Sequence, residues 1–241
     1  MAPMELQLVL SDLLISFLWV WSGSILRYFA YTFLGLGMHT GIGLLKLILA
    51  VLYVSFFSWL GKATNGGAYN PLMVLCHAIS GSFAGFLFVI FGRIPAQVIG
   101  STIGVGLTKI TFPEAYYGPR LNVDIHQGAL MEGFLTLLIV ILSLGIKKIN
   151  PENLVLRTWI SSLSKVILHF LGSDLTGGIM NPATAFGWAY VQGDHTTKEH
   201  LLVYWLAPVE GALLGVWACS LFVDLKKHKE HHQTGFRFKS E

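Results

Sequence analysis

Charged residues are scarce in this chain. They make up only 12% of its 241 residues, whereas hydrophobic residues make up 54%. Soluble globular domains carry about 25% charged residues. The mean hydropathy of +0.62 agrees with this deficit of charge. The composition therefore excludes an ordinary soluble domain and predicts an integral membrane protein.

Cysteine is nearly absent as well: the chain has two, Cys76 and Cys219, both within apolar segments, where we expect packed free thiols. The chain also lacks a phosphate-binding glycine loop, a metal-ligand quartet and a Gly-x-Ser-x-Gly elbow. We therefore expect no enzyme activity, no cofactor and no metal. The net charge of +3 is no argument for a nucleic-acid partner in a membrane protein, and we expect none.

Six apolar runs are long enough to cross a bilayer as helices, which takes about twenty residues. They lie near 8–30, 42–60, 88–110, 126–146, 157–172 and 201–223. Two further apolar runs, one after the second span and one after the fifth, are too short to cross alone. The pattern predicts an all-α membrane protein with six transmembrane helices and two re-entrant half-helices.

Each short run opens with a similar motif, Asn70-Pro71-Leu72 in the first and Asn181-Pro182-Ala183 in the second. Asn is a preferred helix N-cap, and Pro is favoured at the first helical position. If the two half-helices meet at the midplane, their positive ends discourage cations, while the Asn side chains offer donors to water. We therefore expect both asparagines to line a pore. The alternative is ordinary helix capping in a structural loop.

The two halves of the chain repeat each other. The two Asn residues lie 111 residues apart, and so do the stretches 97–100 and 208–211, each of which ends in Gly. Three crossings per half is an odd number, so the repeats must have opposite topology. We expect one channel domain over residues 1–223, with repeats at about 1–112 and 125–223, followed by a basic tail at 224–241.

The distribution of Lys and Arg predicts the orientation, because cytosolic loops are richer in both. With the N-terminus inside, the cytosolic side holds ten such residues and the opposite side five. The prediction is that both termini, and therefore the basic tail, are cytosolic.

Taken together, these motifs resemble the major intrinsic proteins, the aquaporin family, over essentially residues 8–223. The Asn-Pro-Leu motif and the stretch from His169 to Ala183 resemble the plant small basic intrinsic proteins of the second type. The resemblance implies a homotetramer in a lipid bilayer, with one aquaporin-like pore per subunit for water or small neutral solutes. The subfamily suggests the endoplasmic reticulum membrane.

The constriction of that family corresponds to four positions here: Ala50, His169, Gly178 and Thr184. Ala50 is assigned by spacing, and Thr184 stands where the family carries Arg. The loss of this Arg removes a fixed positive charge, so the resemblance implies a wider and less charged ring than a strict water filter. Leu72 replaces the Ala of the family's first motif and adds bulk where the half-helices are expected to touch.

Ionisable groups inside the spans are expected to face a cavity or a partner. Asp12 and Glu132 invite a proton-relay interpretation, but we favour buried carboxylates that accept N–H groups from the re-entrant loops. His169 is expected to line the pore; the alternative is a packed histidine. Lys165 shares the face of His169 one turn earlier, and its role stays open.

The leading hypothesis is a passive channel for water or small neutral solutes through an Arg-less constriction. The alternative is a non-conducting or gated protein of the same fold, with a structural or interaction role in the endoplasmic reticulum and a pore occluded by Leu72. A coupled transporter with Asp12, Glu132 or Lys165 as its proton site is a third hypothesis.

Overall fold

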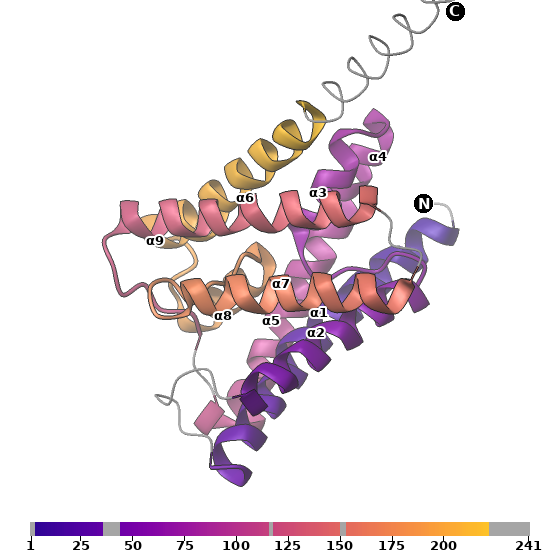
Figure 1. Ribbon diagram of the computed structural model, residues 1–241. Helices are drawn as coiled ribbons and strands as arrows, with labels where there is room; N and C mark the ends of the chain where they lie inside the picture. Colours follow the sequence, from indigo (N-terminus) through magenta and orange to yellow (C-terminus); the bar gives the residue numbers. More distant parts are fainter. Residues whose placement is uncertain (1–2, 36–43, 116–117, 150–152, 222–241) are drawn as a thin grey trace, which may run out of the picture.

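The computed structural model describes residues 3–35, 44–115, 118–149 and 153–221. Within these ranges the chain is a bundle of helices without a β-strand (Figure 1). The prediction of an all-α fold is confirmed. The basic tail predicted at 224–241 lies outside the described residues.

The first half of the chain contains three long helical stretches and one short helix. Its elements are α1 (Pro3–Tyr28) with the π-helical turn η1 (Phe29–Phe33), α2 (Leu44–Ala63), the short α3 (Pro71–Ile79), α4 (Phe83–Phe88), the π-helical turn η2 (Val89–Arg93), α5 (Ile94–Thr111) and the 3-10 turn η3 (Pro113–Ala115). From α4 to α5 the helical backbone is continuous.

The second half repeats this order. It contains α6 (Ile125–Ile149), α7 (Leu154–Ser173), the short α8 (Pro182–Gln192), α9 (Lys198–Leu201), the π-helical turn η4 (Leu202–Leu206) and a helix over 207–221. In both halves the short helix is third, and a π-helical turn interrupts the long helix that follows it. This is the element order that the predicted inverted repeat requires.

Five stretches of the described residues are long and apolar enough to cross a membrane: Pro3–Thr32, Leu44–Ala63, Phe83–Thr111, Ile125–Ile146 and Lys198–Leu221. The predicted span at 157–172 corresponds to α7, a helix of 20 residues that carries Arg157 and Lys165 and is not among these five. Large apolar side chains recur four residues apart on the outer surface, as at Ile99 and Ile103 of α5. A lipid-facing helix has this pattern.

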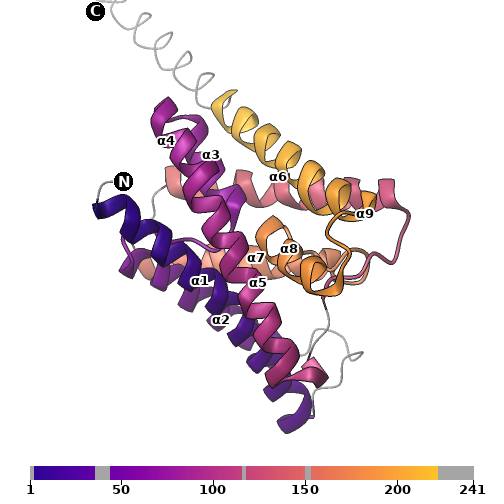
Figure 2. The ribbon, with the colours of Figure 1, turned by 180° about the vertical axis from the view of Figure 1, so that it is seen from behind.

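Glycines bring the long helices of each half into backbone contact. In the first half α1 packs along α5, and the two run side by side in Figure 2. A Cβ added at Gly100 of α5 would overlap the backbone carbonyl of Leu13, and one added at Gly211 would overlap the carbonyl of Gly133 on α6. Small residues allow such close crossings in membranes. The glycines 111 residues apart therefore mark equivalent crossings.

Candidate functional site

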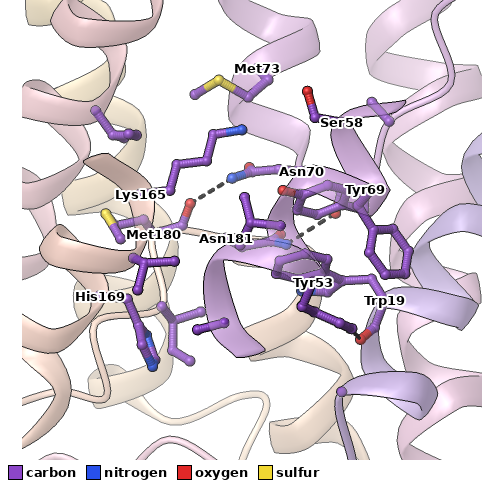
Figure 3. A pocket seen from close by; sticks show the side chains of 18 of the residues that line it. Trp19, Tyr53, Ser58, Tyr69, Asn70, Met73, Lys165, His169, Met180 and Asn181 are labelled. Carbon is purple, nitrogen blue, oxygen red and sulfur yellow. Dashed lines mark hydrogen bonds between the residues drawn. The ribbon is translucent and has the colours of Figure 1, made fainter. Parts of the chain in front are cut away.

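The two motif asparagines cap the two short helices and bond across to each other's loop. The side-chain oxygen of Asn70 accepts from the N–H of Leu72 (3.0 Å), and that of Asn181 accepts from the N–H of Thr184 (3.4 Å). Asn70 Nδ2 donates to the carbonyl of Met180 (2.7 Å), while Asn181 Nδ2 donates to that of Tyr69 (3.0 Å), as Figure 3 shows. Each asparagine thus bonds to the residue before the other one. Because a side-chain amide has two N–H groups, each has a second donor for the cavity.

Asp12 of α1 anchors the loop that leads into α3. Its carboxylate is completely buried and accepts from the backbone N–H of Ala68 at 2.7 Å. Arg93 forms a two-pronged ion pair with it, with N···O distances of 2.7 and 2.8 Å, and Gln97 Nε2 adds a bond at 3.1 Å. Arg93 also donates to the carbonyl of Gly66 at 2.6 Å. Both oxygens of Asp12 therefore have partners, which compensates their loss of water.

Glu132 of α6 anchors the loop that leads into α8. One carboxylate oxygen accepts from the Thr176 hydroxyl (2.7 Å) and the N–H of Ile179 (2.9 Å), and the other accepts from the N–H of Met180 (2.8 Å). The Glu132 side chain is also fully buried. This geometry favours loop anchoring over a proton relay for both carboxylates, because their oxygens are already engaged.

Two residues in the π-helical turns add a second link to these loops. Arg93 ends η2, and Tyr204 lies in η4, 111 residues further along the chain. The Tyr204 hydroxyl donates to the carbonyl of Thr176 at 2.8 Å, as Arg93 does to the carbonyl of Gly66. Neither the role of Tyr204 nor that of Arg93 was predicted from the sequence. Their 111-residue spacing was the signal that could have found them.

Two cavities meet beside Asn181. The first, about 400 Å³, is lined by both asparagines and by Lys165. The second, about 420 Å³, is lined by Asn181, Thr184 and Arg27. The residues that line both cavities are Trp19, Gly23, Tyr53, His169, Ile179 and Asn181. The two cavities are therefore adjacent at these residues, beside the starts of the half-helices.

Aromatic rings form one wall of the first cavity. Trp19 stacks on Tyr69 with ring centres 3.9 Å apart, and Phe57 meets Trp19 edge-on at 5.1 Å. The Tyr53 hydroxyl donates to the backbone carbonyl of Trp19. Figure 3 shows Trp19, Tyr53 and Tyr69 across the cavity from Lys165 and His169. This wall of the cavity is therefore aromatic.

The four predicted constriction residues lie in the linings of these two cavities. Ala50, His169 and Gly178 line the first, while His169 and Thr184 line the second. His169 Nδ1 lies 3.1 Å from the carbonyl of Gly178. Gly178 has a φ of +54°, and a Cβ there would overlap the backbone of His169, so this position requires glycine.

Leu72 packs between helices and does not narrow either cavity, although the sequence raised the alternative that it occludes the pore. Its side chain is 1% exposed and packs with Cys76, Val140 and Ala212, and neither cavity lining contains it. Pro71, Pro182 and Ala183 are buried too. In each motif, therefore, Asn faces the cavity and the next two residues pack into the bundle. The bulk of Leu72 is accommodated between helices.

An all-helical bundle that brings two capped half-helices together between two adjacent cavities defines a membrane channel. The family model described as "Major intrinsic protein" matches residues 4–219. This chain belongs to that family, the aquaporins, and is an integral membrane channel protein and not an enzyme.

Curated relatives agree with the subfamily resemblance. The chain is 47% identical to Aquaporin SIP2-1 of Zea mays over 236 residues, which cover 97% of this chain and 95% of the relative. It is 48% identical to Probable aquaporin SIP2-1 of Arabidopsis thaliana over 211 residues, covering 87% and 89%. Identity to Aquaporin SIP1-1 of Oryza sativa subsp. japonica is 36% over 229 residues, covering 90% and 93%. The predicted resemblance to the second type is confirmed.

Proposed function

We propose that this chain forms a passive pore for water and small neutral solutes, with Asn70 and Asn181 at its polar centre. Ala50, His169, Gly178 and Thr184 form its constriction. The observation that carries the proposal is the crossed pair of asparagine bonds, 2.7 and 3.0 Å long, beside residues that line both cavities. A solute that passes this point exchanges water contacts for the free N–H groups of the two amides.

Thr184 extends the range of solutes beyond water. It stands where a bulky cation would narrow the path, and its hydroxyl is buried with no hydrogen-bond partner among the described residues. Such a hydroxyl gains a bond when a hydroxylated solute passes, since an unpaired buried polar group is costly. Glycerol-like molecules and hydrogen peroxide are therefore solutes of this pore, together with water.

We also propose a homotetramer in the endoplasmic reticulum membrane with both termini in the cytosol. Support comes from the excess of Lys and Arg on one side of the spans and from the resemblance to the small basic intrinsic proteins. The pore occluded at Leu72 finds no support, because Leu72 is packed away from both cavities.

The asparagine mechanism is tested by Asn70→Asp and Asn181→Asp in proteoliposomes. A carboxylate has no N–H to donate to the carbonyl of Met180 or Tyr69, so the crossed bonds become repulsive contacts. We expect the flux of water and glycerol, measured by stopped-flow light scattering, to change by about tenfold. This corresponds to a change of about 1.4 kcal/mol in the free-energy barrier to permeation.

Asn153→Asp is the matched control, because Asn153 caps the exposed start of α7 by accepting from the N–H groups of Val155 and Leu156, and an Asp oxygen can accept them too. Its flux should equal that of the wild type. Unchanged flux in both Asn70→Asp and Asn181→Asp would rule out the asparagine pair as the centre of the pore.

A further inference from the structure

The charged side chains that line the two cavities are all cations. The first lining contains Lys165 and the second contains Arg27, while neither contains Asp or Glu among the described residues. Each cavity therefore holds one fixed positive charge. Asp12 and Glu132 are fully buried and line neither cavity, and their oxygens are engaged by the loops and by Arg93.

Arg27 is held in place by three helices. Its guanidinium lies 5.4 Å from the ring centre of Trp188, in a cation–π arrangement, and it donates to the Ser24 hydroxyl at 3.1 Å. Ser24 in turn accepts from Thr108 of α5 at 3.2 Å. Trp188 is buried and belongs to α8. This charge is therefore anchored to α1, α5 and α8 together.

The position of Arg27 relates directly to the uncharged Thr184. Trp188 follows Thr184 by four residues on α8, so both lie on one helix face, and both line the second cavity with Arg27. A cation from α1 thus lies beside the place where α8 supplies only a hydroxyl.

Lys165 is the cation that lines the first cavity. It lies on α7 one turn before His169, and Figure 3 shows its amine extending towards Asn70 and Met73. Lys165 lines only the first cavity and Arg27 only the second, while Asn181 lines both. A permeating ion would therefore meet one cation in each cavity.

We propose that Arg27 and Lys165 together form the charge filter of this pore. Each repels cations in its own cavity, and both leave the junction between the cavities open for neutral solutes. The positive ends of α3 and α8 supply only about half a charge each, so two full charges dominate the local field. Charged rings select ions in this way in other channels. The inference rests on the proposed function, because a filter requires a pore.

The test measures ions and neutral solutes in the same proteoliposomes. Arg27→Gln, Lys165→Gln and the double variant are compared with the wild type for potassium permeability, by a potential-sensitive dye, and for glycerol flux, by light scattering. We expect each single variant to raise potassium permeability about tenfold and the double variant to raise it further. Glycerol flux stays within about twofold. Arg27→Lys and Lys165→Arg keep the charge and should stay close to the wild type.

The matched control is the double variant Lys62→Gln with Lys109→Gln. Both lysines are exposed and lie outside the two linings, so the same charge is removed with no expected change in potassium permeability. Thr184→Asp is a second test that keeps both cations in place. Its carboxylate beside Arg27 offsets the positive charge in the second cavity, so it should also raise potassium permeability.

Three results would overturn the filter. Intact glycerol flux with wild-type potassium permeability in the Arg27→Gln, Lys165→Gln double variant refutes it directly. If that double variant does not fold, wild-type potassium permeability in Thr184→Asp refutes it instead. No flux of water or neutral solutes through the wild type would overturn the proposed function, and the filter with it.

Discussion

At the scale of single residues, Glu132 shows how one buried group holds a re-entrant loop. Its carboxylate accepts three hydrogen bonds, from the Thr176 hydroxyl and the N–H groups of Ile179 and Met180. Glu132→Gln removes the charge that strengthens these bonds and turns an N–H of the new amide towards a donor. We expect a loss of about 2–4 kcal/mol in stability, seen as a lower melting temperature of the purified protein.

Glu199→Gln is the control for this prediction, because Glu199 is exposed in the first turn of α9. Its effect should stay within about 0.5 kcal/mol. Equal melting temperatures for Glu132→Gln and Glu199→Gln would show that the carboxylate does not hold the loop.

At the scale of elements, the crossing of α1 and α5 depends on the missing side chain of Gly100. A Cβ there would overlap the carbonyl of Leu13, whereas a Cβ at Gly106 of the same helix would meet nothing within 4 Å. Gly100→Ala must therefore push the helices apart, and we expect it to cost about 1–3 kcal/mol. Gly106→Ala should be neutral or stabilise by up to about 1 kcal/mol, because Ala favours helix.

Thermal unfolding of the two glycine variants, run side by side, separates packing from helix propensity. A similar effect of both substitutions would mean that Gly100 acts only through propensity, and the close crossing of α1 and α5 would be wrong.

At the scale of the whole molecule, the sequence predicted the fold well because its signals are local. Asn followed by Pro sets a helix start, and a buried carboxylate needs donors wherever it lies. The positions of the Leu72 and Lys165 side chains were harder to predict, because the direction of a side chain depends on the rotation of its helix about its own axis. Arg93 was missed for a similar reason: its partner Asp12 is 81 residues away, and the π-helical turn that aims it has no clear sequence signal.

The central claim is that neutral solutes pass through the two cavities beside the bonded asparagine pair, and a plug in the first cavity tests it most directly. Ala50 lines this cavity on α2, whereas Leu52 is 49% exposed on the outer surface of the same helix. Stopped-flow light scattering would compare wild type, Ala50→Trp and Leu52→Trp in proteoliposomes, for water and for glycerol. We predict flux well above that of empty liposomes, reduced at least about tenfold by Ala50→Trp and unchanged by Leu52→Trp. Flux that Ala50→Trp leaves intact, or wild-type flux no greater than that of empty liposomes, would contradict the account.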